Sequence, residues 1–173
     1  AEFETSAAAF RAALDQFGMA KVDEAFVAWA GPVTKGGASL TNQSGWALDE
    51  AQLSALTGAT HVKLVNDFVA QTLAVPALQS DDRRTILQGD DETAAPFVVI
   101  GPGTGLGIGI MSARDGTGHV LPGEGGHVTL PSRTEEEASL IRIASEGLGH
   151  LSAERFVSGG ELYRLYEAVA ARS

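Results

Sequence analysis

The chain has 173 residues, of which 44% are hydrophobic and 20% are charged, as in an ordinary globular protein. It contains no cysteine, which excludes disulfides, thiolate zinc sites and cysteine nucleophiles. Its net charge of −10, without any cluster of Lys or Arg, would repel a nucleic-acid backbone, so we expect no nucleic-acid partner.

The N-terminal part is predicted to alternate helices and strands. Thr5 or Ser6 can cap a first helix that ends before Gly18, and this segment lacks the basic start and continuous apolar run of a secretory signal. Gly31-Pro32 separates the first two strands, which could form a hairpin-like pair. The elements expected here are a helix over 6–17, strands over 22–30 and 38–41, a helix over 50–56 capped by Asp49, and a strand over 61–65.

The last of these strands leads directly into Asn66 and Asp67. Such strand ends are where α/β proteins place their chemistry. A carboxylate there can accept a proton from a bound hydroxyl while its neighbour orients that hydroxyl. Asn-Asp after a strand is also a common helix cap, and the spacing alone favours the cap. A helix over 68–75 should follow, as far as Pro76.

A polar stretch over residues 79–95 is our candidate junction between two lobes, residues 1–78 and 96–173. The uncharged segment over residues 97–111 is broken by five glycines and one proline, so it does not read as a membrane span. We therefore expect a cytoplasmic protein without a membrane partner. The C-terminal pattern predicts strands over 97–100, 108–112, 119–121 and 128–130, and helices over 135–145, 152–157 and 160–171, the first with a Thr134/Glu137 capping box.

A glycine-rich turn over residues 101–107 joins two apolar strands. Its backbone can approach phosphate oxygens closely, and Thr104 adds a hydroxyl donor. No helix follows the turn and no Lys-Ser/Thr pair is present, so it is neither a dinucleotide fingerprint nor a P-loop. A glycine-rich hairpin explains the pattern equally well.

A second turn sets Glu124 and His127 among glycines. The two side chains can hydrogen-bond sugar hydroxyls, ligate a metal, or simply form a polar turn. A zinc site would need further ligands, which are scarce in a chain with no cysteine and four histidines, so sugar hydroxyls are the better match. Glu154, beside Arg155, is by itself more typical of a surface helix, and the acidic run 135–137 suits a helix start.

Together these segments resemble the bacterial glucokinase family from about Ala28 to the C-terminus, in the same order and with similar spacing. The segments are AGPVTKGG, LTNQSGW, LVNDFVAQTLAVP, GPGTGLGIG, LPGEGGHVTL and LSAERFVSGGELYRLY. The resemblance implies the two-lobed α/β architecture of the hexokinase/actin-like (ribonuclease H-like) superfamily, with the sugar between the lobes. It also implies a fragment incomplete at both ends, because an Asp-x-Gly-Gly-Thr phosphate motif and the family's last helices are missing. Such a fragment should have little or no kinase activity alone.

The resemblance further implies ATP-dependent phosphorylation of glucose at its 6-hydroxyl, with ATP and Mg²⁺ as cofactors. Asp67 would be the general base, while Asn66, Glu124, His127 and Glu154 would hold the other sugar hydroxyls. Gly103, Thr104 and Gly105 would lie beside the ATP phosphates. No residue is assigned to a metal. The resemblance also suggests a homodimer, although exposed surfaces could drive association in other ways.

Three alternatives remain at this stage. The first is a kinase for another hexose or amino sugar, although related sugar kinases often carry a cysteine zinc motif after the Glu-His turn, which this chain lacks. The second is a sugar-binding module without catalytic activity. The third is an unrelated α/β domain whose glycine turns are structural.

Overall fold

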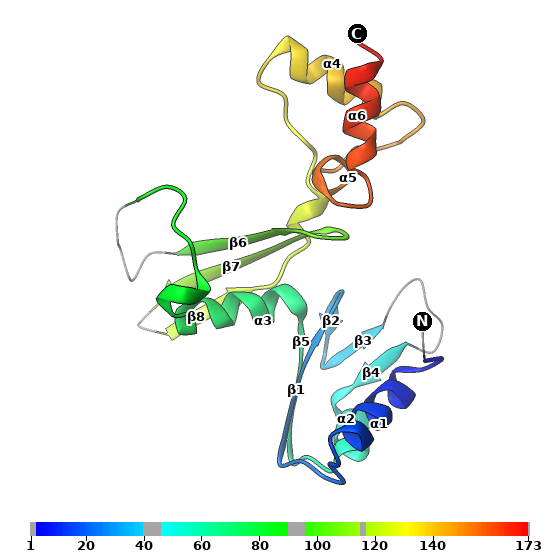
Figure 1. The fold of residues 1–173 in the computed structure, drawn as a ribbon, viewed down its shortest axis with the longest axis vertical. Coiled ribbons are helices and arrows are strands. Elements are labelled where there is room, and N and C mark those ends of the chain that lie inside the picture. The colour runs from blue at the N-terminus through cyan, green and yellow to red at the C-terminus, as the bar shows by residue number, and fades with distance from the viewer. Residues whose placement is uncertain (1–2, 40–45, 90–95, 115–116, 173) are drawn as a thin grey trace. The chain divides into compact units, whose positions relative to one another are not determined.

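The computed structural model describes residues 3–39, 46–89, 96–114 and 117–172. The chain forms two compact units, Ala1–Ala70 and Gln71–Ser173, which divide inside helix α3 (Asp67–Ala74) (Figure 1). This boundary precedes the polar stretch 79–95, of which residues 90–95 lie outside the described part. The division into a small and a large lobe around that stretch stays a prediction.

The first unit contains a parallel pair of strands, β1 (Glu24–Trp29) and β5 (His61–Asn66). Because the strands run in the same direction, their carboxyl ends meet, with Trp29 opposite Asn66. The hairpin-like pairing expected for the first two strands is therefore wrong. Residues 38–39 of the predicted second strand belong instead to a small antiparallel sheet of β2 (Val33–Thr34), β3 (Gly37–Ser39) and β4 (Ala47–Asp49), and its last two residues, 40–41, lie outside the described part.

Two helices of the first unit begin where the sequence predicts. Thr5 caps α1 (Ser6–Gln16) by accepting the N–H of Ala8, and Asp49 caps α2 (Glu50–Thr57) in a reciprocal box with Gln52. A core of buried side chains lies between these helices and the strands. Its members are Ala25, Trp29, Leu48, Leu53, Ala59 and Leu64.

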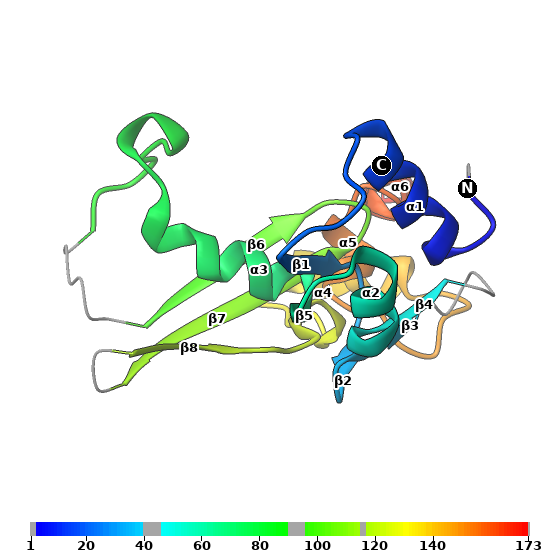
Figure 2. The ribbon, with the colours of Figure 1, turned by 90° about the horizontal axis from the view of Figure 1, so that it is seen from below.

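The second unit contains an antiparallel sheet in the order β6 (Phe97–Pro102), β7 (Leu106–Arg114), β8 (Thr117–Leu121) (Figure 2). The strands continue into the glycine-rich run, so the turn between β6 and β7 is Gly103–Gly105, shorter than predicted. The expected strand over 128–130 is wrong. Residues Gly125–His127 form a 3₁₀ turn, η3, and Thr129 makes only an isolated bridge to Ser152.

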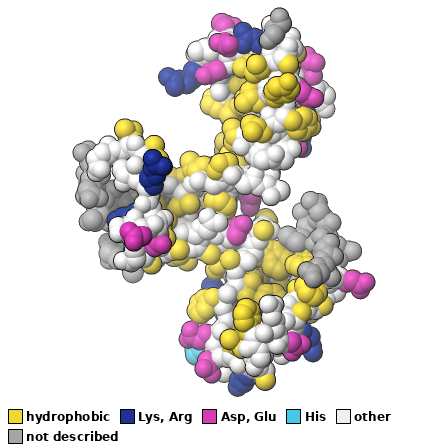
Figure 3. Space-filling model, viewed as in Figure 1, with side chains coloured by type: hydrophobic (Ala, Val, Ile, Leu, Met, Phe, Trp, Pro, Cys, Tyr) yellow, Lys and Arg dark blue, Asp and Glu magenta, His cyan; other side chains and the backbone are white. Residues whose placement is uncertain are grey.

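Three helices complete the second unit: α4 (Glu135–Ala144), α5 (Glu154–Val157) and α6 (Leu162–Ala170). Two short 3₁₀ turns, η1 (Val75–Ala77) and η2 (Ser80–Asp82), follow α3. The core of this unit lies among the helices and contains Ala144, Leu151 and Ala168. Hydrophobic side chains are also exposed on the surface (Figure 3), among them Val98, Ile100 and Leu121 on the sheet.

Within the described ranges, no helix is both long enough and apolar enough to cross a bilayer.

Candidate functional site

Asn66 is the last residue of β5 and Asp67 is the first of α3. The Asn66 Oδ1 atom accepts the N–H groups of Phe68, at 2.9 Å, and Val69, at 3.1 Å, so Asn66 does cap the helix. Its Nδ2 donates to the carbonyl of Gly31, at 3.1 Å, which follows β1. Asn66 therefore connects the end of β5 to the segment that follows β1.

Asp67 is half-buried, and only one of its oxygens is used inside the unit. Oδ1 accepts Asn66 Nδ2 at 3.0 Å and the Phe68 N–H at 2.9 Å. These donors fix the orientation of the carboxylate, and Oδ2 has no hydrogen-bond partner among the described residues. The cap that the sequence favoured is thus present, and it leaves one oriented carboxylate oxygen able to accept a proton.

The Gly103–Gly105 turn is closed by a 2.8 Å hydrogen bond from the Gly103 N–H to the Gly105 carbonyl. Gly103 and Thr104 are exposed. The N–H groups of Thr104 and Gly105 have no acceptor within the described part of the chain. The turn is therefore a hairpin loop with two available backbone donors, and phosphate binding by these donors stays a prediction.

Glu124 immediately precedes η3, and His127 is the last residue of η3. The carboxylate Oε2 of Glu124 is 3.9 Å from His127 Nε2, and the two side chains are 58% and 62% exposed. Gly126 between them is buried against Leu106, the first residue of β7. The turn is anchored to the sheet through its glycine, while both of its polar side chains remain accessible to hydroxyl groups.

Glu154, the first residue of α5, reaches the glycine turn. Its Oε2 accepts the Leu106 N–H at 2.8 Å, immediately after Gly105. Two backbone hydrogen bonds hold the segment around α5 close to the turn. The Ala153 N–H donates to the Val128 carbonyl, and the Gly159 N–H donates to the Gly103 carbonyl. Glu154 is therefore not the ordinary surface acid that its local sequence suggests.

The structure thus groups the predicted residues by unit. Asn66 and Asp67 lie together in the first unit, and Glu154 lies beside Gly103–Gly105 in the second. Glu124 and His127 belong to the second unit as well, on the turn that packs against Leu106. Sequence reasoning missed the role of Gly159, whose only signal is the Ser-Gly-Gly run after a short helix.

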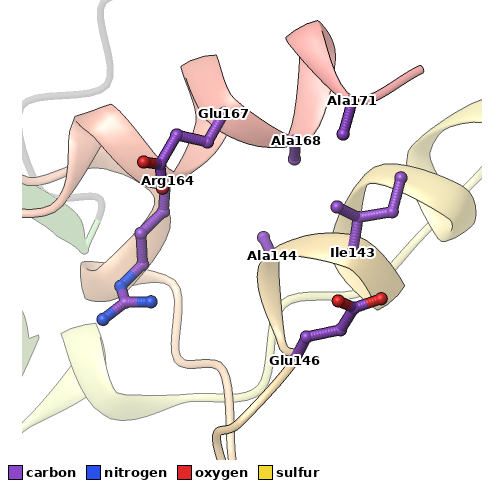
Figure 4. A pocket seen from close by; sticks show the side chains of 7 residues that line it. All are labelled: Ile143, Ala144, Glu146, Arg164, Glu167, Ala168 and Ala171. Atoms are coloured by element: carbon purple, nitrogen blue, oxygen red, sulfur yellow. The ribbon is translucent and has the colours of Figure 1, made fainter.

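A pocket of the second unit lies elsewhere, between α4 and α6, and includes none of the predicted site residues (Figure 4). Ile143, Ala144 and Ala168 supply apolar lining, and Arg164 and Glu167 supply charge. The hydrogen bond that Arg164 Nε donates to the Glu161 carboxylate raises the pKa of Arg164. Nothing in this arrangement matches the chemistry predicted for the chain.

Comparison with known proteins gives a consistent result. The sequence model of the family described as glucokinase matches residues 1–173. The glucokinase of Salmonella typhi is 35% identical over 168 residues, which are 97% of this chain and 52% of that protein. The glucokinase of Salmonella arizonae is 34% identical over the same share of each chain. The chain spans about half the length of the curated relatives it matches.

Solved structures agree with the sequence comparison. A glucokinase from an Antarctic psychrotroph superposes with a TM-score of 0.82 at 31% identity, over 99% of this chain and 53% of that one. A Balamuthia mandrillaris glucokinase in complex with glucose has a TM-score of 0.67 at 24% identity, over 95% and 51% of the two chains, and supports the fold alone. The predicted α/β fold is confirmed, and the match along its full length means that this chain belongs to the glucokinase family.

Proposed function

We propose that this chain carries the sugar-binding residues and the general base of an enzyme that transfers the γ-phosphoryl group of ATP to the 6-hydroxyl of glucose. The observation that carries the proposal is the family match along residues 1–173, with the Asn66-Asp67 pair at the carboxyl end of a parallel strand pair. Because the chain spans about half of its relatives, the activity is proposed for the whole protein.

Asp67 is the proposed base. Phosphoryl transfer requires chiefly positioning and charge stabilisation, so a base must be held still while it accepts the proton of the attacking hydroxyl. The donors on Oδ1 hold the Asp67 carboxylate and leave Oδ2 for that proton. Asn66 is proposed to orient the sugar hydroxyls as well as the Asp67 side chain.

Glu124, His127 and Glu154 are proposed to bind the other sugar hydroxyls. A site that pairs every hydroxyl rejects analogues that would leave one of its polar groups unpaired, which provides the basis for selecting glucose. The exposure of Glu124 and His127 leaves both available to a ligand. The same chemistry would suit another hexose, so the choice of sugar is part of the test.

The Thr104 and Gly105 N–H groups are proposed to bind ATP phosphate oxygens. Mg²⁺ usually binds through phosphate oxygens, waters and one or two carboxylates. Within the described part of the chain, no group of three or more His, Asp or Glu side chains could hold a metal ion. We therefore propose that Mg²⁺ would be held mainly by the nucleotide phosphates and water. We also propose that the enzyme is cytoplasmic and forms a homodimer.

The test is a calorimetric titration of this chain with glucose, repeated with mannose and N-acetylglucosamine. Glucose should bind saturably and more tightly than the other sugars. Glu124→Gln should weaken binding roughly tenfold, because a hydrogen bond to a charged group is lost. Glu135→Gln, on α4, is the matched control and should bind like the unmodified chain.

Asp67→Asn separates the proposed kinase from a sugar-binding module. In the protein that contains this chain, the substitution should abolish formation of glucose 6-phosphate while glucose still binds, because an amide cannot take up the proton. Full phosphoryl transfer by Asp67→Asn would exclude Asp67 as the base. Glucose binding with no transfer even before substitution would favour the sugar-binding module.

A further inference from the structure

The Gly103–Gly105 turn is held from outside at both of its ends by the same segment of chain. At one end, the Glu154 carboxylate accepts the Leu106 N–H at 2.8 Å. At the other, the Gly159 N–H donates to the Gly103 carbonyl at 2.7 Å. Glu154 is the first residue of α5, and Gly159 lies just beyond the end of this helix. One short helix therefore braces the whole turn.

The segment around this helix and the turn approach each other closely at two glycines. A Cβ atom at Gly105 would lie 2.5 Å from Glu154 Oε2, and one at Gly159 would lie 3.1 Å from the Gly103 carbonyl oxygen. The glycines on both sides thus allow the carboxylate and the turn to touch. The Gly159–Gly103 hydrogen bond joins two backbone groups, so this end of the turn is held without any side chain.

The brace also decides which backbone donors the turn can offer. The Gly103 N–H is used within the turn and the Leu106 N–H is used by Glu154. The N–H groups left without an acceptor in the described residues are those of Thr104 and Gly105. Two neighbouring N–H groups bind an anion best when their direction is fixed before the anion arrives, since no ordering is then required on binding.

We infer that Glu154 is a positioning residue for the phosphate-binding turn, through its Oε2, in addition to its proposed contact with the sugar. The other oxygen, Oε1, lies 4.0 Å from the position of a Gly105 Cβ and has no partner among the described residues, so it remains available to a hydroxyl. A single carboxylate would then serve the sugar and the nucleotide. The nucleotide part of this inference rests on the proposed function.

The inference is tested first on the turn itself, by amide hydrogen exchange measured by NMR on this chain. Glu154→Ala should speed exchange of the Leu106 N–H roughly tenfold, which corresponds to the loss of one hydrogen bond to a charged group. Glu154→Gln, which keeps an oxygen acceptor, should restore most of the protection. Glu167→Ala, an exposed carboxylate on α6, should leave exchange unchanged.

Gly105→Ala provides a second route to the same result if Glu154→Ala does not fold. The new Cβ should displace the carboxylate without removing it, and the Leu106 N–H should again lose protection. Exchange of the Leu106 N–H within twofold of the unmodified chain, in a folded variant of either kind, would overturn the inference.

The second measurement is the dissociation constant for ATP in the absence of any sugar. If Glu154 positions the turn, Glu154→Ala should raise this constant roughly tenfold and Glu154→Gln should recover most of the affinity. If Glu154 binds only sugar, Glu154→Ala would weaken glucose binding and leave the ATP constant unchanged, which would overturn the inference. Failure of the unmodified chain to bind ATP would instead count against the nucleotide part of the proposed function, and the exchange data would still decide whether Glu154 holds the turn.

Discussion

Gly126 lies where the polar Glu-His turn meets the sheet, and its lack of a side chain has a direct structural reason. A Cβ atom there would come within 2.2 Å of the Leu106 carbonyl oxygen, a backbone atom that cannot rotate away. Gly126→Ala should therefore lower the free energy of unfolding of the second unit by about 1–3 kcal/mol, as overpacking does. Urea denaturation followed by circular dichroism measures this change.

Gly123→Ala is the matched control for that substitution. It lies in the same turn, and a Cβ at Gly123 would meet no atom within 4 Å. Its unfolding midpoint should match that of the unmodified chain. Equal destabilisation by both substitutions would mean that the turn needs glycine for its backbone conformation and not for its contact with Leu106.

Asn66 is expected to contribute to stability independently of any ligand. It accepts two helix N–H groups and donates to the Gly31 carbonyl and to Asp67 Oδ1. Asn66→Ala removes all four bonds and should cost about 1–3 kcal/mol of unfolding free energy. Asn66→Asp keeps the acceptor for the helix N–H groups but loses the donor. Its melting temperature should therefore lie between those of the unmodified chain and Asn66→Ala. An Asn66→Ala variant as stable as the parent would contradict this role.

Among the elements, those set by local chemistry were predicted well from the sequence. The starts of α1, α2 and α4 follow from Thr5, Asp49 and Thr134, because a capping side chain acts within one turn of the helix. One detail of α4 differs from the prediction. The Glu137 carboxylate accepts the N–H of Arg133, whereas in a full capping box it would accept the N–H of the capping residue, Thr134.

Strand pairing was predicted less well because it depends on partners far along the chain. Glu24–Trp29 pairs with His61–Asn66, and the sequence between them offered a nearer but wrong candidate. The predicted strand at 128–130 failed for a related reason, since its apolar alternation is real but only Thr129 finds a partner. Local pattern identifies a segment that could be a strand, and the fold decides whether it pairs.

The capping of α2 can be tested by itself. The Asp49 side chain accepts the Gln52 N–H at 2.7 Å, and the Asp49 N–H in turn donates to Gln52 Oε1 at 3.0 Å. Asp49→Ala should lower the unfolding free energy by about 1 kcal/mol, while Asp49→Asn, which keeps the acceptor, should cost only a fraction of that. Urea unfolding monitored by tryptophan fluorescence is the measurement. Equal losses for both variants would point to the negative charge at the helix start instead of the cap.

At the scale of the whole chain, the sequence proposes the residues of the candidate site but not the contacts that connect them. The family resemblance implied Asp67, Glu124 and Glu154, yet the hydrogen bond from Leu106 to Glu154 joins residues 48 positions apart. No local spacing encodes such a contact, because it arises only when α5 packs beside the hairpin turn. The sequence shows the glycines that permit this contact, but it does not show why glycine is needed at those positions.

The two compact units should also unfold in distinguishable steps. Both tryptophans of the chain, Trp29 and Trp46, lie in the first unit, so tryptophan fluorescence reports on that unit, whereas circular dichroism reports on both. The two buried clusters share no residue. Gly126→Ala, in the second unit, should therefore lower the urea midpoint seen by circular dichroism and leave the fluorescence midpoint in place. If the fluorescence midpoint falls by the same amount, the two units unfold as one cooperative block, and the separate cores do not act as separate units of stability.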